Sequence, residues 1–293
     1  MRICIAGKNN IAVDGLQYLL REMTIPASDL CVTLNKVDTG VDSWQKSLKK
    51  AAKDFHVAVL PLEELYSIEN LVFLSLEYER IIKPSLFASN RLFNMHFSLL
   101  PAYKGVGMSY IQLLNGESKS GVTLHHIDDG IDTGDVIAMR EFPIGINDTS
   151  RALYFKFIDE AITLFKQNIS SLLSGGFEMK PQPALRATYF SKKFIRYDAM
   201  EIDFKKTSFE IHNQIRALIF PEYQLPAISG SRIESSTLTK ERIGRNECIE
   251  RAEEFIVSGI DGFKIILKKE RRQETRCSGI GGEGGGDVSR SRQ

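Results

Sequence analysis

Short apolar runs alternate with stretches of helical periodicity through the first half of the chain. The runs that fit a single buried strand are residues 3–6, 30–34, 57–60, 71–74 and 92–96. A helical stripe of Ile11, Leu16, Leu19 and Leu20 follows the first run, and a polar-faced helix is expected at 43–54. Strands that alternate with helices imply right-handed crossovers and a mainly parallel sheet. The alternation predicts an α/β fold with helices on both faces of the sheet and ligands beyond the carboxyl ends of its strands.

A long helix is expected to close this first unit. Two more strands are predicted at 121–127 and 135–142, and a helical stripe then runs from Thr149 or Ser150 to the glycines at 175–176. We interpret this helix as core packing only. The first domain is therefore predicted to span residues 1–180.

The character of the chain changes after the sequence PQP at 181–183. A helix near 207–219 and the segment FPEYQLPAISG (220–230) indicate a small α+β domain with β-hairpins, residues 181–274. Residues 275–293 are rich in glycine and polar side chains and have almost nothing to bury, so we predict a disordered tail.

Composition excludes several classes of protein. The 293 residues are 43% hydrophobic and 26% charged, which is ordinary for a globular chain. A formal net charge of +1 provides no basic field for nucleic acid. Four scattered cysteines without a CxxC pair argue against zinc and a disulfide framework and fit a reducing cytoplasm. No apolar run is long enough to cross a bilayer, so no membrane partner is expected.

Asn94 and His96 stand two residues apart in the apolar run RLFNMHF. Side chains at i and i+2 of a strand point to the same side, so both would look into one space at the strand's end. A neutral histidine accepts a proton near pH 7, and an asparagine amide donates to a developing oxyanion. The pair favours acyl transfer. The alternative is a pair of buried polar side chains that are hydrogen-bonded in the core, which would give the same sequence pattern.

A carboxylate to orient the histidine is expected from the loop DDGIDTGD (128–135). Of its four aspartates we favour Asp132, which lies between two glycine-containing turns; the alternative is a hairpin loop rich in turn formers. No G-x-S-x-G elbow provides a nucleophile, so the substrate is expected to supply one, such as an amine.

Further motifs follow the pair in a fixed order. They are N-x-H-x-S-L-L-P from Asn94, Lys-Gly at 104–105, G-V-T-x-H from Gly121 to His125, and D-x-G-D-x-I from Asp132. In this order the chain resembles the folate-dependent formyltransferase family over most of residues 1–180. That family includes methionyl-tRNA, glycinamide ribonucleotide and amino-sugar formyltransferases.

The resemblance implies a Rossmann-like catalytic domain, N10-formyltetrahydrofolate as formyl donor, and no metal. It also implies a catalytic triad of Asn94, His96 and Asp132. An acceptor amine would attack the formyl carbonyl, Asn94 would stabilise the oxyanion, His96 would manage the amine's proton, and Asp132 would hold the imidazole.

The family's pterin contacts correspond to the stretches YERII (78–82) and HIDDGID (126–132). The resemblance implies folate contacts at Tyr78, Arg80, Ile82, Asp128 and Asp129. For Arg80 a surface salt bridge is an equal alternative.

The stretches AGKNNIAV and FPEYQLPAISG resemble the nucleotide-linked sugar N-formyltransferases of bacterial O-antigen and lipopolysaccharide pathways. This resemblance favours dTDP-4-amino-4,6-dideoxyglucose as acceptor, with a 3-amino isomer or a GDP-sugar left open. It also implies a cytoplasmic homodimer paired through the small domain.

The substrate contacts expected on this basis are Lys8, Asn9, Asn10, Ser98, Lys104 and Tyr223. Lys8 would be a point charge for phosphate or else a solvated loop lysine. Phe220 would stack beside Tyr223 or else pack in the small domain.

Two other functions stay open from sequence. One is formylation of methionyl-tRNA or another amine, against which the balanced charge argues. The other is a nucleotide-binding module without chemistry. A redox dehydrogenase is disfavoured, because no G-x-G-x-x-G follows the first strand.

Overall fold

The alternating pattern builds a seven-stranded mixed sheet in a computed structural model that describes residues 1–195 and 201–271. Its strands are β1 (Arg2–Gly7), β2 (Leu30–Leu34), β3 (Ala58–Val59), β4 (Leu71–Leu76), β5 (Leu92–His96), β7 (Lys119–His126) and β8 (Val136–Pro143). The order across the sheet is β3-β2-β1-β4-β5-β7-β8. The first five strands in this order are parallel to one another. At one edge, β7 pairs antiparallel with β5, and β8 pairs antiparallel with β7. The predicted α/β fold with a mainly parallel sheet is confirmed.

Helices connect these strands. They are α1 (Asn9–Arg21), α2 (Leu48–Asp54), α3 (Met108–Leu114) and α4 (Ser150–Ser174), with short 3₁₀ turns at Ala27–Asp29, Leu62–Leu65 and Pro84–Leu86. The helix expected at 43–54 begins only at Leu48. Asp42 accepts a hydrogen bond from the Ser47 amide, and Ser47 caps α2 by accepting from the Lys50 amide. Residues before Leu48 therefore follow a turn.

The chain reverses direction across the sheet at β1. It moves outward from β1 to β2 and β3, and then returns to β4 on the other side of β1. Two loops that leave neighbouring parallel strands in opposite directions open a crevice beyond the strand ends. Lys8 and Glu77 follow β1 and β4 directly and therefore lie at that crevice.

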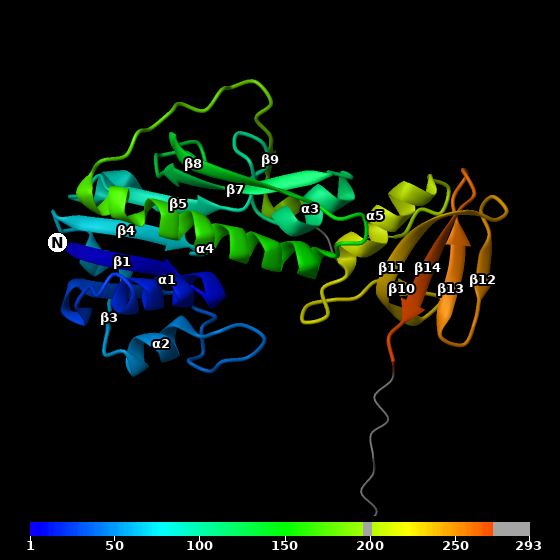
Figure 1. The fold of residues 1–293 in the computed structure, drawn as a ribbon, viewed down its shortest axis with the longest axis horizontal. Coiled ribbons are helices and arrows are strands. Elements are labelled where there is room, and N and C mark those ends of the chain that lie inside the picture. Colours follow the sequence, from blue (N-terminus) through cyan, green and yellow to red (C-terminus); the bar gives the residue numbers. More distant parts are fainter. Residues whose placement is uncertain (196–200, 272–293) are drawn as a thin grey trace, which may run out of the picture.

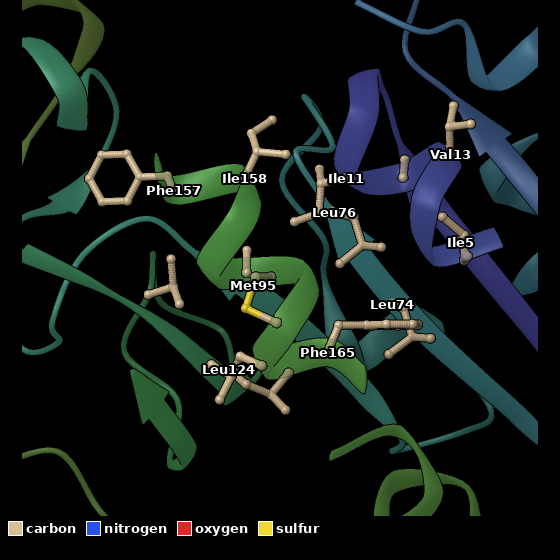
Figure 2. Close-up of a cluster of buried hydrophobic side chains, with 14 of the residues drawn as sticks. Ile5, Ile11, Val13, Leu74, Leu76, Met95, Leu124, Phe157, Ile158 and Phe165 are labelled. Carbon is tan, nitrogen blue, oxygen red and sulfur yellow. The ribbon is translucent and has the colours of Figure 1, made fainter. Parts of the chain in front are cut away.

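Helix α4 forms the largest part of the core. Figure 1 shows it running along the sheet, and Figure 2 shows its Phe165 beside Leu74 of β4. Phe157, Ile158 and Phe165 belong to one buried apolar cluster with side chains of β1, β4 and β5. Thr149 caps its start by accepting a hydrogen bond from the Ala152 amide, and Gly175 ends it at φ +79°. The predicted bounds of this helix are confirmed.

A smaller antiparallel sheet lies at one end of the molecule (Figure 1). In the described chain its order is β10 (Ala227–Ile228), β11 (Ser231–Arg242), β14 (Phe263–Lys269), β13 (Glu254–Ser258) and β12 (Cys248–Glu250). Helix α5 (Ser208–Leu218) packs on it through a separate apolar core that includes Ile211 and Ile215. The predicted helix near 207–219 is confirmed, and the tail at 275–293 lies outside the described residues.

The segment between α4 and α5 carries little regular structure. It contains β9 (Tyr189–Phe190), which pairs in parallel with β6 (Lys104–Gly105), and a 3₁₀ turn at Lys192–Phe194. None of the helices in residues 1–195 and 201–271 combines the length and apolarity that a membrane crossing requires.

Arg216 of α5 fastens the small sheet to the loop before α4. Its side chain is 1% exposed and donates hydrogen bonds to the carbonyls of Gly145 and Asp148 at 2.9 and 3.1 Å, and to Asn213 Oδ1 at 2.8 Å. Burial lowers the pKa of Arg216 to about 10, although the nearby Asp148 charge opposes this. The guanidinium is therefore a buried donor group that three acceptors depend on.

Replacing Arg216 with methionine should lower the free energy of unfolding by about 1–3 kcal/mol, because buried carbonyl oxygens lose their donors. Chemical denaturation measures this. The matched control is Arg245→Met, at an exposed arginine, where a change within about 0.5 kcal/mol is expected. Equal stability of the two variants would contradict the assigned role of Arg216.

Candidate active site

Asn94 and His96 occupy the carboxyl-terminal end of β5 and project from the same side of the strand, as the two-residue spacing predicts. Asp132 comes from the loop between β7 and β8, the neighbouring strands at this edge. The Nδ1 atom of His96 lies 3.5 Å from Asp132 Oδ2, and Asn94 Nδ2 donates to Asp132 Oδ1 at 3.3 Å. The structure thus brings together the amide, the imidazole and the carboxylate.

Local backbone geometry aims Asp132 at this point. The residue adopts a left-handed conformation with φ +54°, which aspartate tolerates better than most residues. The amide of Gly105 donates to Asp132 Oδ2 at 2.8 Å. Behind the loop, Gln182 Nε2 donates to the carbonyls of Asp132 and Gly134 at 2.9 and 2.7 Å. The carboxylate and its backbone are therefore held from two sides.

His125 completes the cluster. Its Nδ1 donates to the carbonyl of His126 at 2.7 Å, which leaves Nε2 to accept from Asn94 Nδ2 at 3.0 Å. One N–H of Asn94 is thereby committed to His125. The other points to Asp132 across 3.3 Å, which is longer than a typical N–H···O bond, so it can be shared with a ligand oxygen.

Burial and charge act in opposite directions on His96. Burial lowers the pKa of His96 below 6.5, and the Asp132 carboxylate and the Tyr103 carbonyl only partly offset this. The carbonyl of Tyr103 accepts from His96 Nε2 at 2.7 Å, so Nδ1 carries the lone pair of the neutral ring. His96 is therefore neutral at pH 7 and able to accept a proton at Nδ1.

Asp132 responds to its neighbours in the opposite sense. Burial alone would raise the pKa of Asp132, but His96, His125 and the Gly105 amide together outweigh it and hold the pKa at about 2. The group is therefore a carboxylate throughout the physiological range.

Two cavities meet at Asn94 and Asp132. Cavity A, of about 400 Å³, extends along residues 78–82 and 127–132, and cavity B, of about 700 Å³, extends toward α4 and residues 220–224. Asn94, Gly105 and Asp132 line both of them, whereas His96 lines cavity B. The cluster therefore stands where a molecule in one cavity would touch a molecule in the other.

Most of the residues predicted to contact folate line cavity A: Tyr78, Arg80, Ile82 and Asp128. Arg80 also forms an exposed ion pair with Glu63 at 2.7 Å, as its alternative interpretation predicted. Asp129 is exposed and lines neither cavity A nor cavity B. Its predicted folate contact stays a prediction.

Some of the predicted substrate contacts line a cavity, and the others do not. Lys8 and Tyr223 line cavity B, and both also line cavity C, a neighbouring space of about 360 Å³ beside Trp44. Asn9 lines cavity C. Phe220 lines cavity B and is 5% exposed, with its ring centroid 5.4 Å from that of Trp44.

Three predicted contacts do not line cavity A, B or C, and as substrate contacts they stay predictions. Ser98 is fully buried and donates to the carbonyl of Ala102 at 2.7 Å, so it stabilises the turn after β5. Asn10 accepts from the Lys46 amide at 2.9 Å and thereby ties α1 to the following loop. Lys104 acts instead as a charge near His96, where it lowers the pKa of that ring.

Sequence reasoning missed several cavity residues. Glu77 and Tyr154 line cavity B, and the Tyr154 hydroxyl donates to Glu77 Oε2 at 2.7 Å. The interpretation of α4 as core packing only was wrong, because Ser150, Tyr154 and Phe157 line this cavity. The helical spacing of apolar residues gave no signal that the first turns of α4 line a cavity.

Comparisons with known proteins agree with this geometry. A family model described as formyl transferase matches residues 46–169. The crystal structure of WlaRD, a sugar 3N-formyltransferase, in the presence of dTDP and 5-N-formyl-THF is 51% identical. It has a TM-score of 0.91 and covers 93% of this chain and 99% of its own. The chain belongs to the formyltransferase family.

Two other comparisons place this formyltransferase within the family. An N-formyltransferase from Helicobacter canadensis, in complex with folinic acid and dTDP-3-aminofucose, is 52% identical with a TM-score of 0.90. It covers 92% of this chain and 100% of its own. A methionyl-tRNA formyltransferase from Halorhodospira halophila is 25% identical over 96% of this chain and 92% of its own. The predicted family and its enzymatic class are confirmed.

No group of three or more His, Cys, Asp or Glu side chains that could hold a metal ion occurs in the part of the chain that the structure describes.

Replacing Asp132 with asparagine should lower the pKa of His96, because the carboxylate raises that pKa against the effect of burial. NMR titration of the imidazole in both proteins measures the shift, and the resonance is assigned by its loss in His96→Asn. An unchanged or higher pKa in Asp132→Asn would show that the carboxylate does not act on the ring.

Replacing Gln182 with alanine should lower kcat about 10- to 100-fold while KM for both substrates changes little, because the Asp132 loop loses two donors and shifts. The control is Gln167→Ala, at an exposed position of α4. If Gln182 only stabilised the fold, the melting temperature would fall while kcat per folded molecule stayed at the wild-type value.

Proposed function

We propose that this formyltransferase moves a formyl group from N10-formyltetrahydrofolate to the 3-amino group of a dTDP-linked 3-amino-3,6-dideoxyhexose. The observation that carries the proposal is the junction of cavities A and B at Asn94 and Asp132. A donor in one cavity and an acceptor in the other would meet beside the neutral ring of His96. The two relatives at 51–52% identity, which were crystallised with folates and dTDP or a dTDP-sugar, support the pairing of substrates.

Cavity A suits the flat ring of a folate. Ile82 and Ile127 are buried apolar walls, and Tyr78 adds an aromatic face. Asp128, whose Oδ1 accepts from Thr133 and Gly130, provides a fixed polar edge. A volume of about 400 Å³ lies in the range of small-molecule sites. These residues would hold the donor, which supplies the formyl carbon.

The residues at the junction divide the chemistry of transfer. The amine nitrogen forms a bond to the formyl carbon, the bond from that carbon to N10 breaks, and one proton passes from the amine to N10. Asn94 would donate its weakly held N–H to the carbonyl oxygen as negative charge develops. His96 would accept the amine's proton at Nδ1 and return it to the leaving nitrogen. Asp132 would stabilise the imidazolium formed between these steps.

The position of the amine departs from the sequence-based preference. Resemblance favoured a 4-amino sugar, but WlaRD is a sugar 3N-formyltransferase and the Helicobacter canadensis enzyme was crystallised with dTDP-3-aminofucose. Both matches extend over at least 99% of the relative's chain, so they include the residues of its site. We therefore propose the 3-amino isomer. A role in surface polysaccharide synthesis, a cytoplasmic location and a homodimer stay predictions.

Methionyl-tRNA is the weaker alternative acceptor. The relative with that activity is 25% identical, half the value of the sugar enzymes. A net charge of +1 also provides little attraction for a polyanion.

Incubating the protein with N10-formyltetrahydrofolate and dTDP-3-aminofucose should yield the N-formyl sugar, detected by mass spectrometry. His96→Asn should lower kcat/KM about 100- to 10,000-fold, because the proton acceptor is lost. The control is His56→Asn, at an exposed histidine with φ +55°, a conformation that asparagine tolerates. Turnover of methionyl-tRNA but not of the sugar would refute the proposed acceptor, and full activity of His96→Asn would refute the mechanism.

A further inference from the structure

Glu77 lies at the point where the sheet changes direction, and the mechanism above does not use it. It follows β4 directly and lines cavity B. Its φ of +62° is uncommon for a residue with a Cβ, and such conformations cost free energy that the surrounding structure must supply. The backbone therefore holds this side chain in place against a local preference.

Only one oxygen of the Glu77 carboxylate is used within the protein. Oε2 accepts from the Tyr154 hydroxyl at 2.7 Å and from Asn9 Nδ2 at 3.3 Å. Asn9 Nδ2 also donates to the Tyr154 hydroxyl at 2.9 Å, so one residue of α1 and one of α4 fix this oxygen together. Among the described residues, Oε1 accepts no hydrogen bond and is not sealed from solvent, so it is available in cavity B.

Glu77 and His96 lie at the same end of two neighbouring strands. Leu76 of β4 pairs with Met95 of β5, so the next position on each strand is Glu77 and His96. Both side chains line cavity B. A molecule that fills cavity B therefore contacts both residues.

Glu77 is a carboxylate of cavity B that has no cationic partner in the described structure, so it could bind a cation. Asp132 is committed to His96, Asn94 and the Gly105 amide. Lys8 is the neighbouring cation, and it forms no ion pair with Glu77 in the described structure.

The remaining charged residues of the cavity are Glu79 and Lys192. Glu79 is exposed, and its Oε1 accepts from the Lys36 amide at 2.8 Å. Burial raises the pKa of Glu77, and Lys8 opposes this shift.

We propose that Glu77 Oε1 binds the amino group of the acceptor sugar and so selects amino sugars over sugars that carry a hydroxyl at the same carbon. The inference rests on the proposed function. An amine that arrives protonated gives a charge-assisted hydrogen bond to a carboxylate, which is about twice as strong as a neutral one. It loses its extra proton to solvent before the neutral nitrogen attacks. The Tyr154 and Asn9 contacts keep the carboxylate from rotating, so the free oxygen is already oriented when the sugar enters.

The test compares two ligands in two proteins. Calorimetry gives the Kd of dTDP-3-aminofucose and of dTDP-fucose, in which a hydroxyl replaces the amine, for wild type and Glu77→Gln. We expect Glu77→Gln to weaken binding of the amino sugar about 10- to 100-fold and of the hydroxyl sugar less than about 3-fold. The matched control is Glu79→Gln, which removes the same charge from the wall of the same cavity and should weaken both ligands equally.

Equal weakening of the two ligands by Glu77→Gln would overturn the proposal, as would the same selectivity change in Glu79→Gln. Glu77→Asp keeps the charge but withdraws it by one methylene, so the same direction of change is expected if Glu77→Gln fails to fold. If wild type binds neither dTDP-sugar, the proposed function fails first. Tight binding of both ligands without selectivity for the amine would overturn only the role of Glu77.

Discussion

The carboxylate of Asp132 organises the site, because a buried charge requires partners and these partners come from three strands. Its Oδ1 faces Asn94 of β5 and His125 of β7, and its Oδ2 faces the Gly105 amide of β6 and His96. A carboxylate left without these groups would be costly to bury. Asn94 and the Gly105 amide donate to the carboxylate, and His96 and His125 lie 3.5 and 3.6 Å from it. These contacts bring β5, β6 and β7 together at the junction of the cavities.

The neutral state of His96 results from a balance that neither burial nor charge sets alone. Burial disfavours the imidazolium, and Asp132 favours it. A ring that is neutral at rest accepts a proton, and the carboxylate beside it stabilises the product of that transfer. This balance depends on exclusion of water. The walls of cavities A and B are therefore part of the acid–base chemistry as well as of substrate binding.

The fold was predictable from sequence because short apolar runs indicate strands, as at β5, and apolar residues at helical spacing indicate helices, as at α4. Asn94 and His96 were found because the period of a strand places i and i+2 together. Tyr154 was not found, since periodicity cannot show which turns of a 25-residue helix line a cavity, and Glu77 was not found because it lies just outside its strand. Trp44 was assigned to a helix that begins only at Leu48.

The domain boundary predicted from composition falls after residue 180, yet the segment that follows it contacts the residues around Asp132 and His96. Residues 181–195 were assigned to the small domain, yet Gln182 holds the backbone of Asp132, and β9 pairs with β6. Phe190 stacks on Tyr103 at 5.5 Å, and the carbonyl of Tyr103 accepts from His96. Because these contacts converge on the imidazole and the carboxylate, the geometry of the proposed catalytic residues depends on a segment that carries almost no regular structure.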